Sequence, residues 1–350
     1  MSTRIGIDAR LIRAYGIGSY VRGLLRGLEA LEGGEDYVVF ARQGDRSLIP
    51  ARFEVVEADV EPYTASEPWR MGRIAGRARL DLLHAPHFTL PWTDLPIVTT
   101  LFDAIPFHFK LRNPVAFSYI ALMMQTAARR AQRILTISHA AGRDLAEALD
   151  VDPSRITVVP IGVGEEFFSE GRAATEWAPY FLFVGRVAVH KNIETLLEAL
   201  SLVRRSDPSV RLVLVGGKHD GRGVAGVVVP GYVSDEELLA IYRGAVAVVM
   251  PSFMEGFGLP PLEGMALGTP AITSMAEALV EVTGNAALHV NARSPLELAE
   301  AMLALRKDGA LRARLALEGR QRARKFTWRA CAAATRAVYF EVLSLQSGSR

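Results

Sequence analysis

Short apolar runs recur along the whole chain, and stretches with the spacing of amphipathic helices separate them. In the first half, the runs predict strands at Arg4–Asp8, Tyr37–Ala41, Phe53–Ala58, Leu82–Ala85, Ile97–Leu101, Arg133–Ser138 and Ile156–Ile161. In the second half, they predict strands at Phe181–Val184, Arg211–Val215, Val227–Val229, Val246–Met250, Ala271–Thr273 and Ala287–Val290. Helical spacing fills most of the intervals, as in Ile193–Val203 and Leu296–Leu305. Apolar strands that alternate with helices indicate parallel sheets with helices on both faces.

The alternation pauses between Gly162 and Pro179, and we interpret this segment as a linker between two domains. A chain of 350 residues is too long for one core of ordinary size. We therefore predict two doubly wound, Rossmann-like α/β domains that face one another, the first over residues 1–165 and the second over residues 166–327. In such sheets, ligands bind at the carboxyl ends of the strands.

Composition narrows the class of protein. Half of the residues are apolar and the formal net charge is only +2, so we expect a folded chain, and nothing indicates nucleic acid as a partner. The single cysteine, Cys331, excludes an intramolecular disulfide framework and fits a cytoplasmic protein. The chain begins with a predicted strand and contains no apolar run of about eighteen residues, so we expect neither a signal peptide nor a membrane span.

The first glycine pair, Gly16 and Gly18, stands between the first predicted strand and a helix. Glycines at this point let the backbone approach a phosphate or sugar at the helix N-terminus. The full dinucleotide fingerprint is absent because Val21 occupies the place of its third glycine. The second predicted strand also ends at Ala41 and Arg42 rather than at an acid that could hold a ribose, which disfavours a nicotinamide enzyme. This motif alone leaves a ligand loop and a simple turn equally open.

A second candidate site is the string FVGRVAVHKN, residues 183–192. Arg186 and Lys191 stand between a strand that ends at Gly185 and a helix that begins near Asn192. Two cations beside a helix N-terminus suit a diphosphate, although solvated loop cations are the common alternative. Gly185 favours the ligand site, because it lets the backbone approach closely.

The third candidate site, MEGFGLPPLEGM, spans residues 254–265 and follows an apolar strand. Gly256 and Gly258 leave amide groups open at the start of a helix whose first turn tolerates two prolines. Such amides bind anions. Carboxylates such as those of Glu255 and Glu263 accept hydrogen bonds from paired hydroxyls on a sugar or ribose. The residues therefore predict a cleft for a diphosphate and a sugar.

The string from Glu255 to Glu263 resembles the glutamate–seven residues–glutamate signature of retaining family 4 glycosyltransferases with the GT-B fold. The resemblance covers nearly the whole chain. GRVAVHKNIETLLEAL and GYVSDEELLAIYRGAVAVVMPS are similar to the family's second domain, and HAPHFTLPW, TISHAAGRDL and VVPIGV to its first. The closing FTWRACAAATRAVYFEVL resembles the terminal helix that crosses back to the first domain, here at about residues 328–345. The N-terminal IGIDARLIRAYGIGSYVRGLL is similar to polysaccharide mannosyltransferases.

The resemblance implies roles for individual residues. Arg186 and Lys191 would hold the donor diphosphate, and Glu255 the hydroxyls of the donor sugar, which makes these three the catalytic candidates. Glu263 would bind the nucleotide ribose. The remaining donor-binding candidates are Gly16, Gly18 and Asp103 from the first domain and Gly185, Gly231, Tyr232, Val233, Gly256, Phe257, Gly258 and Leu259 from the second. Residues 231–233 would lie along the base.

The implied reaction is transfer of a hexose from a nucleotide sugar, of the GDP-mannose or UDP-glucose type, with retention at the anomeric carbon. The acceptor would be a hydroxyl of a glycan, a lipid-linked molecule or a small molecule. No cofactor is expected, and no metal, because cationic residues would neutralise the diphosphate. A sugar-nucleotide epimerase and a non-catalytic sugar-nucleotide-binding protein remain alternatives.

One position departs from the family. Many relatives have a histidine before the aspartate that corresponds to Asp103, and here it is Phe102, which cannot transfer a proton. A histidine acid or base therefore cannot be carried over. His84 and His87 either lie near that place or are packing histidines.

Two arginine-containing stretches raise the question of membrane contact. Residues 112–133 form an amphipathic stretch with Arg129, Arg130 and Arg133 near its end, and residues 312–329 are rich in arginine. The first could rest on a membrane that carries a lipid-linked acceptor, and the second could attract anionic lipid. The patterns favour core packing with a solvated basic end for the first stretch, and a solvated helix face for the second.

Overall fold

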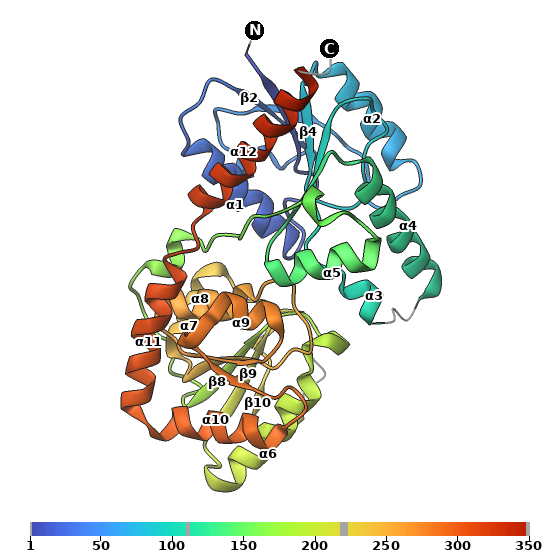
Figure 1. Cartoon of the computed structure of the whole chain (residues 1–350). Coiled ribbons are helices and arrows are strands. Elements are labelled where there is room, and N and C mark those ends of the chain that lie inside the picture. The colour runs from blue at the N-terminus through green and yellow to red at the C-terminus, as the bar shows by residue number, and fades with distance from the viewer. Residues whose placement is uncertain (1, 110–112, 218–222, 348–350) are drawn as a thin grey trace. The chain divides into compact units, whose positions relative to one another are not determined.

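The computed structural model describes residues 2–109, 113–217 and 223–347 (Figure 1). Arg112, at the start of the first arginine-containing stretch, lies outside the described residues. The chain divides into two compact units, Met1–Gly162 with Thr327–Arg350, and Val163–Phe326. Each unit is built around one parallel sheet.

The sheet of the first unit has seven parallel strands in the order β3-β2-β1-β4-β5-β6-β7. Its strands are β1 (Arg4–Asp8), β2 (Asp36–Ala41), β3 (Glu54–Glu57), β4 (Leu82–Ala85), β5 (Ile97–Thr100), β6 (Arg133–Thr136) and β7 (Ile156–Val158). The chain order reverses between β1 and β4, where Ile5 pairs with Leu82 and Ile7 with His84. This reversal is the mark of a doubly wound sheet.

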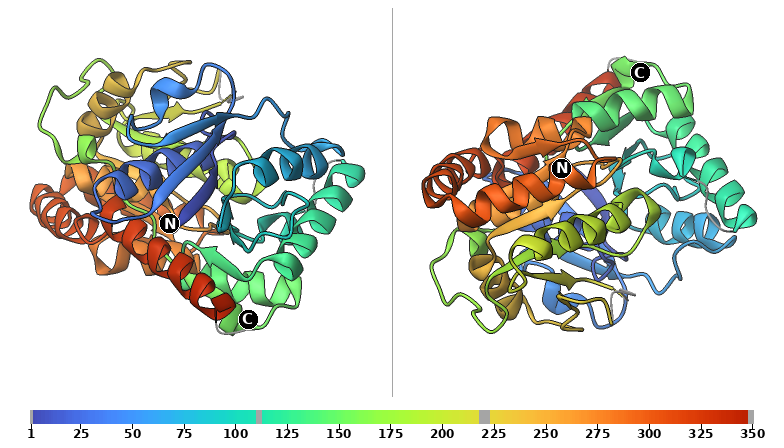
Figure 2. Two further views of the ribbon diagram at one scale, coloured as in Figure 1. Left: turned by 90° about the horizontal axis from the view of Figure 1, so that it is seen from above. Right: turned by 90° about the horizontal axis from the view of Figure 1, so that it is seen from below.

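Helices cover both faces of this sheet. They are α1 (Ile17–Glu29), α2 (Glu67–Arg77), α3 (Ile105–His108), α4 (Pro114–Arg130), α5 (His139–Leu149) and α12 (Trp328–Ser347), with short 3₁₀ turns η1 (Arg46–Leu48) and η2 (Pro153–Arg155). The last helix, α12, lies along α1 (Figures 1 and 2). The predicted return of the C-terminal helix to the first domain is therefore confirmed.

The second unit has six parallel strands in the order β10-β9-β8-β11-β12-β13. They are β8 (Tyr180–Val184), β9 (Arg211–Val215), β10 (Val227–Val228), β11 (Ala247–Met250), β12 (Ala271–Ser274) and β13 (Leu288–Val290). Its helices are α6 (Ile193–Ser206), α7 (Asp235–Gly244), α8 (Leu259–Leu267), α9 (Glu277–Thr283), α10 (Pro295–Lys307) and α11 (Gly309–Ala323), with 3₁₀ turns η3 (Glu165–Phe168), η4 (Val189–Lys191) and η5 (Gly284–Ala286). Each predicted strand is confirmed, and the largest difference is at β7, which ends at Val158 rather than Ile161.

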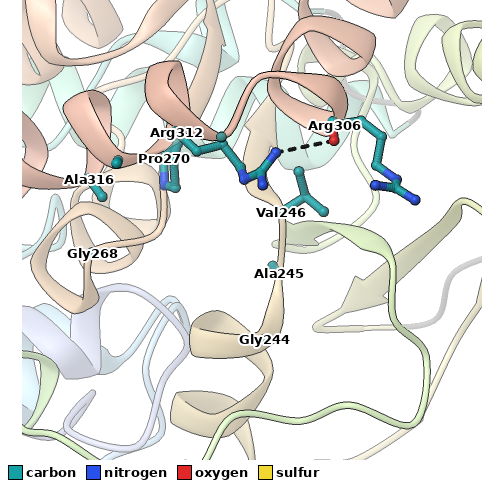
Figure 3. A pocket seen from close by; sticks show the side chains of 10 residues that line it. Gly244, Ala245, Val246, Gly268, Pro270, Arg306, Arg312 and Ala316 are labelled. Atoms are coloured by element: carbon teal, nitrogen blue, oxygen red, sulfur yellow. Dashed lines mark hydrogen bonds between the residues drawn. The ribbon is translucent and has the colours of Figure 1, made fainter.

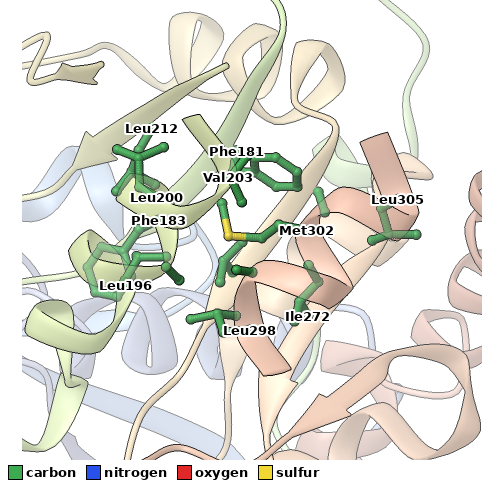
Figure 4. Close-up of a cluster of buried hydrophobic side chains, with 14 of the residues drawn as sticks. Phe181, Phe183, Leu196, Leu200, Val203, Leu212, Ile272, Leu298, Met302 and Leu305 are labelled. Atoms are coloured by element: carbon green, nitrogen blue, oxygen red, sulfur yellow. The ribbon is translucent and has the colours of Figure 1, made fainter. Parts of the chain in front are cut away.

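Helices cover both faces of the second sheet and bury the apolar side chains of its strands. On one face, Phe181 and Phe183 of β8 pack against α6 and α10, where Leu200 and Met302 are fully buried (Figure 4). On the other face, Leu182 packs in a second cluster with residues of α7. Alternate residues of one strand thus face two helical layers, which explains why β8 is apolar throughout.

Local signals fix several element ends. Ser234 accepts a hydrogen bond from the amide of Glu237 and Glu237 reaches back to the amide of Ser234, so the predicted capping box at the start of α7 is confirmed.

Most of the predicted linker is packed against the second unit. From Val163 onward it belongs to the second unit, where Phe167 and Trp177 pack on the core and the amide of Ala174 donates to the carbonyl of Ala240.

The arginines of residues 312–329 are exposed or half-buried, as interpreted, but several of them also have partners. Arg312, Arg320 and Arg322 of α11 donate to carbonyls at the C-terminal ends of α10, α8 and α9, respectively. These groups have no partner within their own helix, and a guanidinium group satisfies them and the helix dipole together. The arginines therefore stabilise three neighbouring helix ends.

The interpretation of α4 as a core helix holds only for its last part. Its buried residues are Met124, Ala127 and Ala128, whereas Val115 and Leu122 are 76% and 58% exposed. Among residues 2–109, 113–217 and 223–347, no helix is long and apolar enough to cross a membrane.

Candidate active site

The carboxyl ends of β8 and β11 bring Lys191 and Glu255 together in the second unit. The Lys191 Nζ atom lies 2.7 and 2.8 Å from the two carboxylate oxygens of Glu255. The two side chains are only 18% and 8% exposed. Ser252, just after β11, donates a hydrogen bond of 2.6 Å to the same carboxylate. Sequence analysis proposed both charged residues as ligand groups, and the structure shows that they also bind each other across 64 positions of the chain.

Backbone contacts hold the loops that carry this ion pair. The amide of Phe253 donates to the carbonyl of His190 at 2.7 Å, which joins the loop after β11 to η4. Ser274, at the end of β12, donates to the carbonyl of Ser252 at 2.5 Å. Ser252 and Ser274 are both fully buried, and sequence analysis missed them. Their only signal in the sequence is their position at strand ends, where polar side chains in a parallel sheet face the ligand edge.

Glycines line the neighbouring strand ends. Gly185, directly before Arg186, has a φ of 155°, and Gly216 and Gly217 after β9 have φ values of 97° and 91°. A Cβ atom on Gly217 would lie 3.5 Å from Cα of Arg186. The two loops therefore approach closely, and the positive φ angles favour glycine. The adjacent glycines at positions 216 and 217, directly after a predicted strand, could have been recognised in the sequence.

The helix predicted after the two glycines is confirmed as α8. Gly258, its N-cap, has a left-handed conformation (φ 104°, ψ 49°) and, as a glycine, provides no capping side chain. Pro260 lies in the first turn, beside Leu259. Phe257 is 4% exposed and packs edge-on against Phe326, with ring centroids 5.6 Å apart. Only the backbone of Phe257 can therefore contact a ligand here.

Glu263 lies further along α8 in acidic surroundings. Tyr242 donates a hydrogen bond of 2.7 Å to its carboxylate. Burial, together with the negative charges of Glu166 and Asp235, raises the pKa of Glu263 to about 7, although the bond from Tyr242 acts in the opposite direction. This carboxyl group changes charge near neutral pH.

The predicted base-binding residues form a turn before α7. Gly231 has a φ of 88°. Tyr232 is 96% exposed, whereas Val233 packs against the core around Tyr242. The exposed phenol and the adjoining backbone are accessible to a ligand.

The other candidates lie in the first unit, at the carboxyl side of its sheet. Gly16 is the N-cap of α1 with a φ of 77°, and a Cβ atom on Gly18 would collide with the carbonyl of Ile12. Asp103 accepts a hydrogen bond of 3.0 Å from the amide of Ile105 at the start of α3. The ring of Phe102 packs edge-on against Tyr20, with centroids 5.1 Å apart.

Both candidate histidines, His84 and His87, are packing residues. His84 is fully buried and bonds to Thr100 and to Tyr339 of α12, and burial lowers its pKa to about 3. His87 is 2% exposed, and its Nε2 atom lies 3.0 Å from a carboxylate oxygen of Asp8. The neutral His84 thus links α12 to the sheet, and neither side chain is open to a ligand.

A pocket lies at the opposite end of the second sheet from Lys191 and Glu255 (Figure 3). Val246 and Pro270, which precede β11 and β12, line it together with Arg306 and Arg312. Arg312 donates to the carbonyls of Leu305 and Arg306, and Arg306 pairs with Asp207 at 3.2 Å. Its guanidinium groups therefore already have partners, and we assign no role to this pocket in the candidate active site.

Two family models match the chain side by side. The model described as Glycosyltransferase Family 4 matches residues 14–167, and the model described as Glycosyl transferases group 1 matches residues 165–322. The O-antigen chain mannosyltransferase B of Escherichia coli is 26% identical over 302 residues, 80% of this chain and 79% of the relative. In seven further curated relatives, the matched stretch covers 51–60% of their length.

Solved structures share the fold. A sucrose-phosphate synthase from Thermosynechococcus elongatus has a TM-score of 0.76 and 20% identity, with 98% of this chain and 100% of that chain covered. The Anabaena protein HepE, solved in complex with UDP and glucose, has a TM-score of 0.75 and 14% identity, with 97% and 100% covered.

Two parallel-sheet Rossmann-like domains with these neighbours define a protein of the GT-B fold. With the two family models, they show that the chain belongs to the family 4 glycosyltransferases, as the sequence motifs predicted.

Proposed function

We propose that this glycosyltransferase moves a hexose from a nucleoside-diphosphate sugar to an acceptor hydroxyl, with retention and without a metal ion. The observation that carries the proposal is the buried ion pair of Lys191 and Glu255. It lies at the ligand edge of a parallel sheet, in the same unit as the start of α8, where the N-cap is a glycine.

The ion pair suits a donor that carries both a diphosphate and a sugar. An unpaired lysine or glutamate at this depth is unfavourable, so each residue gives the other a partner and orders it before substrate arrives. A diphosphate offers Lys191 a stronger anionic partner, and Glu255 then becomes available to accept hydrogen bonds from sugar hydroxyls. The same pair can therefore serve the free and the substrate-bound enzyme.

In the proposed reaction, the bond between the sugar anomeric carbon and the diphosphate oxygen breaks as the acceptor oxygen attacks from the same face. The departing phosphate oxygen receives the acceptor proton. Arg186 and Lys191 stabilise the negative charge of the leaving nucleotide. This route requires no enzymic nucleophile and no histidine, so Phe102 is compatible with it.

Relatives and structural neighbours support two donor classes. Mannosyltransferases among the relatives favour GDP-mannose, and the complex of HepE with UDP and glucose favours UDP-glucose. Glu263 would bind the ribose in either case. For the acceptor, relatives that build O-antigen chains favour a glycan, which can be lipid-linked.

The first experiment measures thermal stability of the purified protein against UDP-, GDP-, ADP- and dTDP-sugars, without metal. One nucleotide class should stabilise the protein, and the sugar-dependent part of the shift should disappear in Glu255→Ala. A shift from a nicotinamide cofactor alone would contradict the proposal. Binding of a nucleotide sugar with neither nucleotide release nor sugar transfer, whichever acceptor is tested, would favour the non-catalytic alternative.

Lys191→Ala provides the first mutational prediction. The variant should retain its fold but turn over at least about a hundredfold more slowly, because one preorganised donor to a developing charge is worth about 3 kcal/mol. Turnover of the identified donor is the measurement. Lys307→Ala is the control, because it also removes one lysine charge, from the last turn of α10. Equal turnover in both variants would remove Lys191 from the mechanism.

A further inference from the structure

We propose that Asn192 is a positioning residue, which fixes the Lys191 loop against the Glu255 loop and so sets the place of the Lys191 ammonium group. The inference rests on the proposed function and assigns a residue to it that is expected to touch neither the donor nor the acceptor. Asn192 lies between η4 and α6, next to Lys191, and is 6% exposed.

The Asn192 side chain uses all of its hydrogen-bonding groups. Its Nδ2 atom donates to the carbonyl of Pro251 at 2.9 Å and to the carbonyl of Ala292 at 2.6 Å. Its Oδ1 atom accepts a bond of 2.7 Å from the hydroxyl of Thr195. Pro251 follows β11 and Ala292 follows β13, so one amide group connects the ends of β8, β11 and β13.

These bonds fix the backbone of the two loops that carry Lys191 and Glu255. Pro251 is followed directly by Ser252, which donates to Glu255, and the next amide, that of Phe253, donates to the carbonyl of His190. The bond from Asn192 to the carbonyl of Pro251 and the bond from the amide of Phe253 to the carbonyl of His190 join neutral groups, so neither depends on charge. When a diphosphate draws the Lys191 side chain away from Glu255, both connections remain, and the lysine starts from a fixed position.

The backbone conformation explains why asparagine occupies this position. Asn192 has a φ of 56° and a ψ of 45°, in the left-handed region where asparagine is enriched among residues other than glycine. Glycine would adopt this conformation but provide no side-chain bonds. Aspartate would direct two acceptor oxygens at the carbonyls of Pro251 and Ala292, which are acceptors themselves.

The central variant is Asn192→Gly, which keeps the left-handed backbone and removes the connections. The probes are GDP and UDP, and the readout is their dissociation constant at a temperature well below unfolding. We expect the constant for the bound nucleotide to rise at least about tenfold, because small displacements of a positioned group have large effects. Asp150→Gly is the matched control, since Asp150 is also a left-handed residue at a helix end, with a φ of 51°. Its nucleotide affinity should stay at the wild-type value.

A double-mutant cycle with Lys191→Ala separates positioning from a general loss of stability. If Asn192 acts through Lys191, removing the lysine should weaken binding much less in Asn192→Gly than in wild type. If Asn192→Gly does not fold, Thr195→Val, which removes one bond to the amide, gives the milder form of the same test and should raise the constant by a smaller factor.

The outcomes distinguish this inference from the proposed function. A wild-type protein that binds none of the nucleotides or their sugars contradicts the proposed function itself. A wild-type protein that binds GDP or UDP, with unchanged affinity in the Asn192 or Thr195 variant or with independent effects of Asn192 and Lys191, overturns only the positioning role. A lower melting temperature with unchanged affinity has the same meaning, because it shows a structural role alone.

Discussion

Glu263 lies on α8 with its carboxyl group beside Tyr242, and burial together with Glu166 and Asp235 raises its pKa to about 7. If the ribose hydroxyls donate to this carboxylate, the charged form should bind the donor more tightly. Protonation converts one acceptor oxygen of the carboxylate into a hydroxyl group, so the affinity for the nucleotide should fall as pH decreases through 7. Between about pH 8 and pH 6, we expect a loss of about tenfold, since the charged fraction falls by about that factor.

Nucleotide titrations across this pH range provide the measurement, and Glu263→Gln is the control because it cannot titrate. The variant should bind weakly with a flatter pH profile. If its profile is as steep as that of wild type, the titrating group is elsewhere. Tyr242→Phe removes the donor that favours the charged form, and should move the midpoint to higher pH.

Sequence analysis found the residues of this site but not their partners. Glu255 and Glu263 are predicted from a glycine- and proline-containing strand–helix junction, and Lys191 from two cations beside a helix N-terminus; the family resemblance implies their individual roles. The contact of Lys191 with Glu255 and the bonds of Asn192 join segments more than 50 residues apart. Such contacts are set by which strands become neighbours in the sheet, and the periodicity of one segment does not contain that information.

At the scale of elements, the central strands were predictable because their residues are mostly apolar, and this pattern follows from burial on both faces of the sheet. The use of the α11 arginines was not predictable. An exposed arginine and an arginine that caps a neighbouring helix have the same local sequence, and only the packing of α11 against α8 decides between them.

Arg322 provides a prediction about that packing. Its guanidinium group donates to the carbonyls of Val282 at 2.8 Å and Glu281 at 2.5 Å, at the C-terminal end of α9. Arg322→Ala should lower the free energy of unfolding by about 1–2 kcal/mol, because bonds from a charged donor at a helix C-terminus are lost. Urea unfolding measures this. Arg314→Ala, which removes an exposed pair with Glu318, should change it by less than about 0.5 kcal/mol. Equal losses would contradict the capping role.

Helix α4 provides a prediction about membrane contact. Val115 and Leu122 are exposed, whereas the buried residues of α4 begin at Met124. Apolar side chains exposed on a helix, apart from the core, suit the interface of a bilayer, where a lipid-linked acceptor would lie. Val115→Glu with Leu122→Glu should therefore weaken co-sedimentation with phosphatidylglycerol vesicles and leave the melting temperature unchanged. Leu296→Glu, on a helix of the second unit and 60% exposed, should leave co-sedimentation unchanged. A wild-type protein that does not sediment with vesicles would exclude this contact.

At the scale of the whole molecule, the chain builds two cores and closes the first with its last helix. The first unit holds residues from both ends of the sequence, while the second is continuous. Trp328 of α12 packs directly on α1, and Tyr339 bonds to the buried His84 of β4. The first unit therefore depends on α12. The family resemblance predicts that this helix returns to the first unit, whereas the pattern of strands and helices along the chain does not.

The junction of α1 with α12 allows a test of this dependence. A Cβ atom on Gly23 would collide with the indole ring of Trp328, so Gly23→Ala must displace that ring and should destabilise the first unit by about 1–3 kcal/mol. Gly76→Ala is the control, because Gly76 lies within α2 and a Cβ atom there would meet no atom within 4 Å. The control should be neutral or stabilising by up to about 1 kcal/mol, since alanine favours helix more than glycine does.

Calorimetry shows which core responds, because units with separate cores can unfold in separate transitions. In Gly23→Ala, one transition should move to lower temperature, while a bound nucleotide should still stabilise the other. At temperatures where both units are folded, nucleotide affinity should not change measurably, since Lys191, Glu255 and Glu263 lie in the second unit and the first-unit candidates Gly16, Gly18 and Asp103 are in a folded unit. If affinity falls together with the first transition, the packing of α12 on α1 also controls the donor site, and the two cores do not act independently.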